Sequence, residues 1–420
     1  MHAESEIRDR VDHLFRRKAG QMVSVLARHF GVEHIDLIED AVQEAMIAAM
    51  RKWPTSGIPE NPSAWLTQVA KNRVLDSLRR HSKWSGGSID DDGFAEPVMP
   101  STGEPRYDGE LNEDQLRMIF ACCSPEIPPD SQVALTLKVV GGFGVREIAR
   151  AYLAKEDTIA KLLTRAKQKL QTTSLEIPAG EELRERLDAV LRVLYLMFNE
   201  GYSASEGEDL IRRDPCFEAI RLAETVAAHP MTSLPKVHAA AALFLFQAAR
   251  LATRTDIQGD LLLLSQQDRS KWDKRMIARG LEQFRKAAAG DEFTDYHLEA
   301  EIASIHVMAP DFDSTNWQRI IGCYDVLQSR RFSPVVELNR IVALGQIHGP
   351  EKALVKLGEL GQHFLMTSFN LFHITKAHFL SEARRREEAV SAYDRAAELT
   401  SNDTVRRFLK RKIEMLTSPE

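Results

Sequence analysis

The residues with the clearest chemical pattern lie between Gly144 and Leu170, where basic side chains predominate. Seven residues from position 146 to 169 are basic and three are acidic. The basic residues are Arg146, Arg150, Lys155, Lys161, Arg165, Lys167 and Lys169, and the acidic ones are Glu147, Glu156 and Asp157. Apolar residues at helical spacing predict a buried stripe opposite Lys161 and Arg165. This stripe consists of Ile159, Leu163, Ala166 and Leu170.

The same stretch predicts two helices separated by a tight turn, in which Leu153 takes the place of the usual glycine. A short helix, a turn and a basic helix suit a reader of DNA, because the major groove admits one helix and the N-terminal residues of that helix reach the base edges. The alternative is a helical hairpin with a solvated charged face. The stretch by itself leaves both interpretations open.

A second basic helix is predicted after Asn61 and Pro62, which make a good N-cap and first helical residue. One acid, Asp76, is accompanied in it by five basic residues: Lys71, Arg73, Arg79, Arg80 and Lys83. This helix is a candidate surface for tracking DNA phosphates, although basic helices are also common as plain soluble surface.

A helix with one acidic face is predicted upstream, from Asp36 to Trp53. Its polar face carries Asp36, Glu39, Asp40, Gln43 and Glu44, opposite an apolar stripe that includes Ile38 and Val42. Such a face is either solvated surface or a docking surface for a basic partner helix.

The whole chain has 420 residues and a net charge of −6, so DNA contacts must come from local basic patches. Four cysteines without metal-ligand spacing predict buried thiols in a reducing cytoplasm. A charged N-terminus and the lack of a long apolar run predict neither a signal peptide nor a membrane span. Residues 84–108 are rich in Gly, Pro, Ser and acids and predict a flexible linker.

Taken in order, the segments EDAVQEAM, AWLTQVAKNRVLDSLRR and VREIARAYLAKEDTIAKLLTRAKQKL resemble the extracytoplasmic-function (ECF) group of RNA polymerase sigma factors. The resemblance implies a sigma region 2 at 6–83 and a sigma region 4 helix-turn-helix at 109–172. It implies three sets of binding residues. The polymerase-binding set is Asp36, Glu39, Asp40, Gln43 and Glu44. The set for the −10 element is Lys71, Asn72, Arg73, Arg79 and Arg80. The set for the −35 element is Thr158, Lys161, Arg165 and Lys167.

The remaining residues exceed what such a sigma factor needs. They predict a helical extension at 181–290 and tetratricopeptide-like repeats at 291–417, which would stack into a solenoid with a groove for a peptide or another domain. Ala377, Leu380, Ala389, Tyr393 and Ala396 carry the repeat spacing. The combination resembles an ECF subgroup with a tetratricopeptide-like extension. Its signature is Asn199, Glu200, Gly201 and Tyr202, read either as a helix cap with Gly201 as the C-cap or as an interdomain contact.

The predicted fold is therefore all-α, and the predicted function is promoter recognition for core RNA polymerase with a built-in regulatory tail. The alternative is a non-sigma helix-turn-helix regulator or adaptor on a helical-repeat scaffold. No nucleophile–base spacing, phosphate-binding glycine loop or metal cluster stands out, so neither an enzyme nor a cofactor or metal is expected. The expected partners are core RNA polymerase and promoter DNA, with no membrane.

Overall fold

The structure is a computed structural model, and it describes residues 18–84, 108–151, 154–202, 206–207, 211, 213–256 and 259–418. Two compact units make up the chain, Met1–Met197 and Phe198–Glu420. Apart from Trp84 and Asp108, the predicted linker at 84–108 lies outside the described residues, as do residues 6–17 of the first predicted domain.

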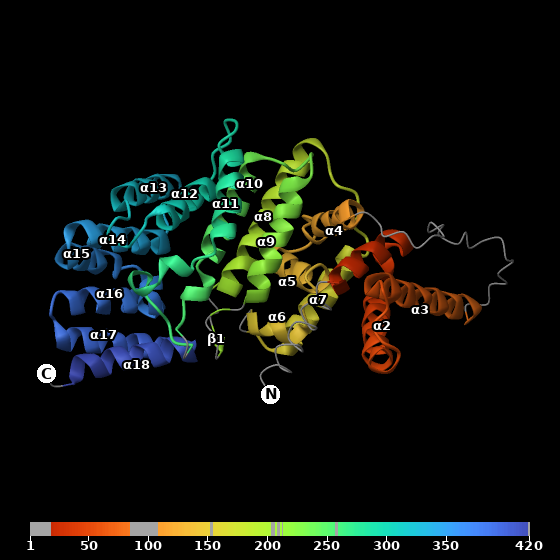
Figure 1. Cartoon of the computed structure of the whole chain (residues 1–420), viewed down its shortest axis with the longest axis horizontal. Helices are drawn as coiled ribbons and strands as arrows, with labels where there is room; N and C mark the ends of the chain where they lie inside the picture. The colour runs from red at the N-terminus through yellow and green to blue at the C-terminus, as the bar shows by residue number, and fades with distance from the viewer. Residues whose placement is uncertain are drawn as a thin grey trace. The chain divides into compact units, whose positions relative to one another are not determined.

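The described part of the first unit is helical (Figure 1). Residues 18–30 form a helix that is followed by the 3-10 turn η1 (Val32–His34). The further helices are α2 (Ile35–Ser56), α3 (Pro62–Trp84), α4 (Asp108–Cys122), α5 (Pro129–Val139), α6 (Val145–Ala151), α7 (Glu156–Leu170) and α8 (Gly180–Tyr202), which continues into the second unit.

The second unit is also helical, and its only strands among the described residues are two-residue segments. The strands β1 (Glu206–Gly207) and β2 (Ser401–Asn402) pair in parallel, with Glu206 opposite Ser401. Its first helices are α9 (Arg213–Ala228), α10 (Pro235–Ala248), α11 (Lys274–Ala287) and α12 (Asp295–Met308). They are followed by α13 (Trp317–Arg330), α14 (Pro334–His348), α15 (Pro350–Leu360), α16 (Asn370–Glu382), α17 (Arg386–Leu399) and α18 (Asp403–Thr417). Short 3-10 turns are η2 (Leu251–Thr253), η3 (Leu264–Gln266), η4 (Arg269–Lys271) and η5 (Phe364–Ser368). The predicted all-α class is confirmed.

The ends of α2 and α3 show why the chain turns between these two helices. Gly57 follows α2 with a φ of 80°, a left-handed conformation that glycine adopts without strain. The N–H of Gly57 donates to the carbonyl of Trp53 at 3.0 Å. Asn61 then caps α3, because its Oδ1 accepts a hydrogen bond from the N–H of Ala64 at 3.0 Å. The predicted start of this helix is confirmed.

The core of the second unit is built around α10, whose alanines Ala239–Ala242 are all fully buried. Helices α9, α11 and α12 pack against α10. The approach of α11 requires glycine at position 280, because a Cβ atom there would lie 2.6 Å from the ring of Phe246. The alanine side chains of α10 are small, so its neighbouring helices must come close to α10 to leave no empty space.

From α13 to α18, each helix packs mainly on its neighbours along the chain. Ala377, Leu380, Ala389, Tyr393 and Ala396, the positions predicted to carry the repeat, all lie in one buried cluster formed by α16, α17 and α18. All five are buried in the core of this part of the unit. Assignment of these helices to tetratricopeptide-like repeats stays a prediction.

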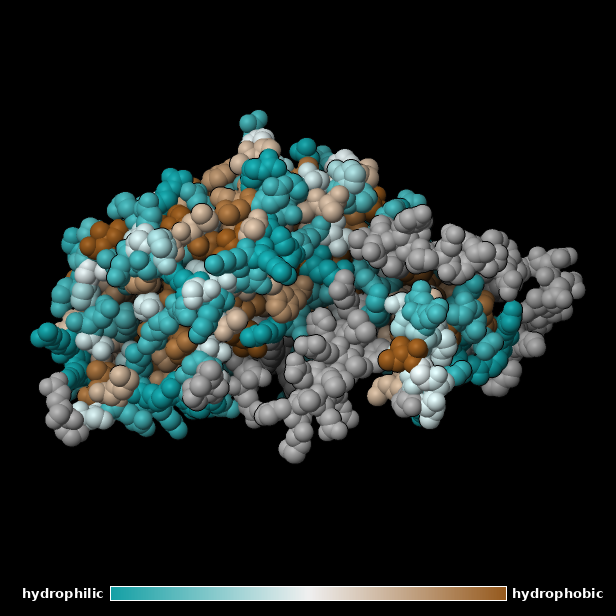
Figure 2. All heavy atoms as spheres, viewed as in Figure 1, coloured by the Kyte–Doolittle hydropathy of each residue, from teal (hydrophilic) through white to brown (hydrophobic). Residues whose placement is uncertain are grey.

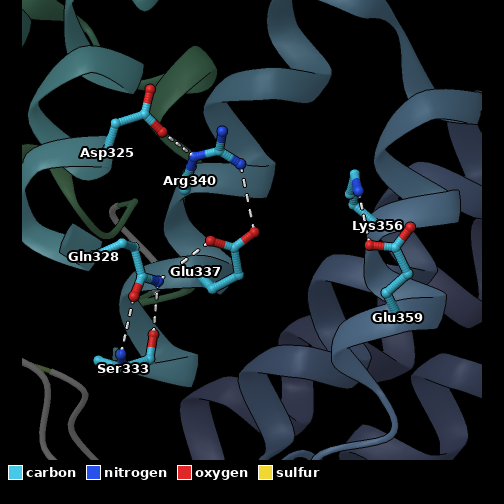
Figure 3. A network of polar contacts seen from close by, with 7 residues as sticks. All are labelled: Asp325, Gln328, Ser333, Glu337, Arg340, Lys356 and Glu359. Carbon is cyan, nitrogen blue, oxygen red and sulfur yellow. Dashed lines mark hydrogen bonds and ion pairs between the residues drawn. The ribbon is translucent and has the colours of Figure 1, made fainter. Parts of the chain in front are cut away.

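Polar side chains connect α13 with α14 on the outside of this array (Figure 3). Arg340 donates to Asp325 at 2.6 Å, and its other end lies 3.5 Å from Glu337. The amide of Gln328 exchanges two 3.0 Å hydrogen bonds with the backbone of Ser333. These bonds hold the turn between the two helices, where Ser333 also caps α14.

None of the described helices is long and apolar enough to cross a membrane.

Candidate functional site

The basic helix α7 has the two faces that its periodicity predicts. Ile159, Leu163, Ala166 and Leu170 are buried, and α7 packs on α5 and α6. Thr158, Lys161 and Arg165 are exposed on the opposite face. Within the described part of the chain, neither Lys161 nor Arg165 has an ion-pair partner. Their charges are therefore available to an external anion.

Lys167 differs from the other predicted −35 residues because its side chain is only 16% exposed. Its Nζ lies 2.8 Å from Oδ1 of Asp36 and forms a second ion pair with Glu39. Both acids belong to α2 and had been expected to face an external partner. The structure instead places one predicted DNA-binding lysine against two predicted polymerase-binding acids.

Two further contacts complete this group, which we call the α2–α7 contact and define as Asp36, Glu39, Lys138, Lys167 and Gln171. Lys138 of α5 lies 3.7 Å from Glu39, and the amide of Gln171 donates to Asp36 at 3.2 Å. Glu39 is 8% exposed, whereas Asp36 is 61% exposed. Burial lowers the pKa of Lys167, but Glu39 and Asp36 raise it by more, so the pKa lies above its ordinary value of 10.5.

The prediction that Glu39 lies on an open polar face of α2 is therefore wrong, because its side chain is buried. A single helix cannot reveal this burial, since the covering lysines come from α5 and α7. A carboxylate that loses its water requires such charged partners.

The rest of the acidic face on α2 is exposed, as predicted. Asp40, Gln43 and Glu44 face solvent. Ile47 and Met50 follow them on the same side of the helix and are 48% and 65% exposed. Figure 2 shows hydrophobic residues exposed beside hydrophilic ones at this helix. Sequence analysis did not single out these two, although their spacing of seven and ten residues from Asp40 places them in the same phase.

Helix α3 presents its predicted polar residues to solvent. Asn72, Arg73, Arg79 and Arg80 are exposed, and Lys71 is half-buried. Arg73 lies 3.3 Å from Glu44 of α2, but both side chains remain more than half exposed. Such an exposed pair contributes little energy and can exchange for another partner.

Two tryptophans join α2 to α3 beside this basic face. Trp65 is half-buried, and its ring centroid lies 5.6 Å from that of Trp53. Lys52 lies over the Trp65 ring at 5.9 Å. Ile58, in the loop between the two helices, is 71% exposed. The Trp65 ring therefore contributes to packing, whereas Ile58 is accessible from outside.

The predicted signature residues Asn199 to Tyr202 all lie within α8, in the part that belongs to the second unit. The helix continues through Gly201, so this glycine is not the C-cap that had been predicted. Tyr202, the one further residue of the helix, stacks on Phe198 with ring centroids 5.7 Å apart. Asn199 is exposed and Glu200 is half-buried.

All four cysteines are buried and free. Burial raises the pKa of Cys123 and of Cys216 to about 12, which keeps both thiols protonated. No group of His, Cys, Asp and Glu among the described residues has the geometry of a metal site.

Comparison with known proteins relates this geometry to families. The chain is 35% identical over 408 residues to the "Uncharacterized protein R00370" of Rhizobium meliloti (strain 1021), and the match covers 95% of this chain and 94% of that protein. The chain belongs to the same family as R00370. The name of this relative gives no function.

Two further matches concern the N-terminal half. Residues 14–83 match the family Sigma-70 region 2. The "ECF RNA polymerase sigma factor SigM" of Bacillus subtilis (strain 168) is 26% identical over 138 residues, which are 32% of this chain and 78% of that protein. These matches support a sigma factor, and sigma factors are not enzymes.

The segment after the helix-turn-helix matches a different family. Residues 186–288 match a family of unknown function, DUF6596. The predicted tetratricopeptide-like subgroup is thus not confirmed by the comparisons. No solved structure matches the chain.

Proposed function

We propose that this protein is an ECF-type sigma factor that directs core RNA polymerase to promoters by reading −10 and −35 elements. The observation that supports the proposal best is the combination of three exposed faces in one unit. These are the acidic and apolar face of α2, the basic face of α3 and the basic face of α7. A Sigma-70 region 2 match covers the first two of these helices.

The face of α2 is the proposed docking surface for core polymerase. Asp40, Gln43 and Glu44 supply charge and hydrogen-bond acceptors, and Ile47 and Met50 supply apolar area that would be buried on binding. Interfaces of this kind combine an apolar centre with a polar rim.

Helix α3 is the proposed reader of the −10 element. Asn72, Arg73, Arg79 and Arg80 would neutralise phosphates and contact bases. Separating the strands costs a few kcal/mol per unstacked base, so an extruded base needs a surface to bind. Ile58, in the exposed loop beside α3, offers an apolar contact for it.

Helix α7 is the proposed reader of the −35 element through Thr158, Lys161 and Arg165. Lys167 would join them only after it leaves Asp36 and Glu39. The same separation would expose Asp36 and Glu39 to polymerase. We infer that the α2–α7 contact opens when the sigma factor engages polymerase and DNA.

Binding of core polymerase distinguishes this proposal from a non-sigma helix-turn-helix regulator. The purified chain should associate with core polymerase and support transcription from a subset of promoters selected with the complex. Asp40→Lys should weaken association, whereas Glu126→Lys, an equal charge reversal at an exposed position between α4 and α5, should not. If the unmodified chain does not bind core polymerase, the proposed function is wrong.

A further inference from the structure

Two arginines of the second unit share the ring of Tyr202. Arg250 follows the end of α10 and Arg254 follows η2, so one helical turn separates them in sequence. The guanidinium carbon of Arg254 lies 3.8 Å from the centroid of the Tyr202 ring, and that of Arg250 lies 5.9 Å from it. Two positive charges are therefore held next to each other.

Neither arginine has a carboxylate partner within the part of the chain that the structure describes. Arg254 is only 9% exposed, and its single hydrogen bond goes from Nη1 to the backbone carbonyl of Tyr202. Arginine cannot lose its proton at any ordinary pH, so this charge persists when buried. A buried charge without an opposite charge beside it is unfavourable.

Other arginines of the same unit show what is normal for this protein. Arg221 lies 2.6 Å from Glu218 and Arg340 lies 2.6 Å from Asp325. Even Arg269, which has no ion pair at hydrogen-bonding distance, donates to the carbonyls of His306 and Ala309 at 2.7 and 2.8 Å. Arg250 and Arg254 differ from these three arginines, because among the described residues neither has a carboxylate and their shared neighbour is the ring of Tyr202.

Further donors around this pair are also unsatisfied. The Tyr202 hydroxyl, the Arg250 Nε and the Trp272 Nε1 are buried and make no hydrogen bond to the residues that the structure describes. Trp272 is 3% exposed and lies near the end of α10, because the next residue, Asp273, donates its N–H to the carbonyl of Ala249 at 2.8 Å. Buried donors are nearly always paired, so several unpaired ones in one place indicate a missing acceptor.

His306 borders the same positive region. Burial, and then the charges of Arg250 and Arg269, lower its pKa to about 3, so the imidazole is neutral at physiological pH. Its Nδ1 is buried without a hydrogen-bond partner. The ring can therefore donate or accept one hydrogen bond without adding charge.

We propose that Tyr202, Arg250 and Arg254, with Trp272 and His306 at their border, form a binding site for a small oxyanion. The ligand class is a compact molecule that carries a phosphate or carboxylate group. Planar guanidinium groups match both groups, and their hydrogen bonds to anions are stronger than neutral ones. The depth at which Arg254 is buried favours a small ligand over an acidic peptide. Except for His306, the site lies in the segment that matches the family of unknown function, and it does not depend on the proposed sigma activity.

Thermal unfolding and calorimetry of the full chain test this site. Sodium phosphate, sodium succinate and sodium chloride are compared at equal ionic strength. A ligand that binds only the folded state raises the Tm, so phosphate, succinate or both should raise it above the value in chloride. Binding of phosphate alone would identify a phosphate-bearing ligand, and binding of succinate alone a carboxylate-bearing one.

Three variants separate binding from folding. Arg250→Gln should weaken anion binding at least tenfold, and Tyr202→Phe should weaken it about fivefold through loss of one neutral donor. Arg250→Gln should not lower the Tm in chloride, because it removes a positive charge that has no carboxylate partner among the described residues. Arg285→Gln, which removes an exposed α11 arginine paired with Glu282, should leave anion binding unchanged. The proposal is overturned if neither anion binds, or if Arg250→Gln and Tyr202→Phe bind as the unmodified chain does.

Discussion

Lys167→Met is expected to loosen the contact between α2, α5 and α7 without unfolding them. Methionine keeps the length and much of the apolar volume of lysine, so the change removes chiefly the charge. Among the described residues, Glu39, which is 8% exposed, would then keep only Lys138 as an ion-pair partner, at 3.7 Å.

The magnitude follows from the unequal burial of the two acids. Removing one partner of a fully buried ion pair costs about 3–5 kcal/mol. Asp36 is 61% exposed and regains water, so only the loss at Glu39 counts fully. We therefore expect a loss of about 2 kcal/mol, which corresponds to about a thirtyfold rise in the fraction of molecules with the contact open.

Hydrogen exchange of the α2 and α7 amides measures this opening directly, because exchange follows the population of opened molecules. Lys169→Met is the matched control, since Lys169 is an exposed lysine of the same helix and no ion pair is recorded for it in the described chain. Exchange in Lys167→Met should rise in α2 and α7, whereas the control should resemble the unmodified chain.

A second substitution tests the cause. Glu39→Gln removes the buried charge that Lys167→Met leaves without its main partner, so the double variant should regain part of the lost protection. A double variant that loses as much as the two single variants combined would refute the reasoning, as would equal exchange in Lys167→Met and Lys169→Met.

The pH dependence has a definite sign. The pKa of Lys167 is raised in the folded chain, so its contribution is complete below the ordinary value of 10.5 and is lost as the pH rises through the raised pKa. The difference between Lys167→Met and the unmodified chain should therefore stay constant from about pH 6 to 9.

Three other outcomes are expected. The double variant Lys161→Ala with Arg165→Ala should reduce transcription that depends on the −35 element, because each lost base contact weakens promoter binding by about 1–3 kcal/mol. Binding to core polymerase should be unchanged. Equal transcription would remove α7 from the interface with DNA. Truncation after Thr173 should change polymerase binding or transcription if the C-terminal helices regulate the sigma unit in cis, and identical behaviour under every condition would make them an independent module. Because burial raises the pKa of Cys123 to about 12, only about one thiol in ten thousand is ionised at pH 8. Alkylation at Cys123 should consequently be slow in the folded chain and fast in denaturant, and fast labelling of the folded chain would contradict its burial.

Local periodicity predicted most of the unit that carries the candidate interfaces. The buried stripe of α7, the Asn61 cap and the exposed basic residues of α3 depend on residues three or four positions apart, so they can be read within one helix. Glu39 and Lys167 could not be placed in this way, because each is neutralised by a residue about a hundred positions or more away in the chain. The prediction of Gly201 as the C-cap was wrong for a related reason. Tyr202 stacks on Phe198 and remains in the helix, although glycine usually ends one.

The arginine pair at Tyr202 was equally hidden from the sequence. Arg250 and Arg254 resemble any two exposed basic residues after a helix. Only the fold reveals that Arg254 is buried and that, among the described residues, neither arginine has an acid beside it. The exposure of Ile47 and Met50, by contrast, could have been predicted from the sequence, because their helical spacing from Asp40 places them on the same exposed side of α2.

Gly20 allows a close backbone contact within the first unit, in addition to the ion pairs of the α2–α7 contact. A Cβ atom at this position would overlap the carbonyl group of Val140, so the helix of residues 18–30 meets the end of α5 backbone to backbone. A single methyl group at position 20 would act as a wedge between the two predicted sigma modules while leaving every charge of the chain in place. The close arrangement of these modules therefore has two separate determinants, one of shape and one of charge. Among natural variants of this family, substitution at position 20 would indicate whether the close arrangement itself is under selection. Substitution at Lys167 would indicate whether the strength of that arrangement is under selection.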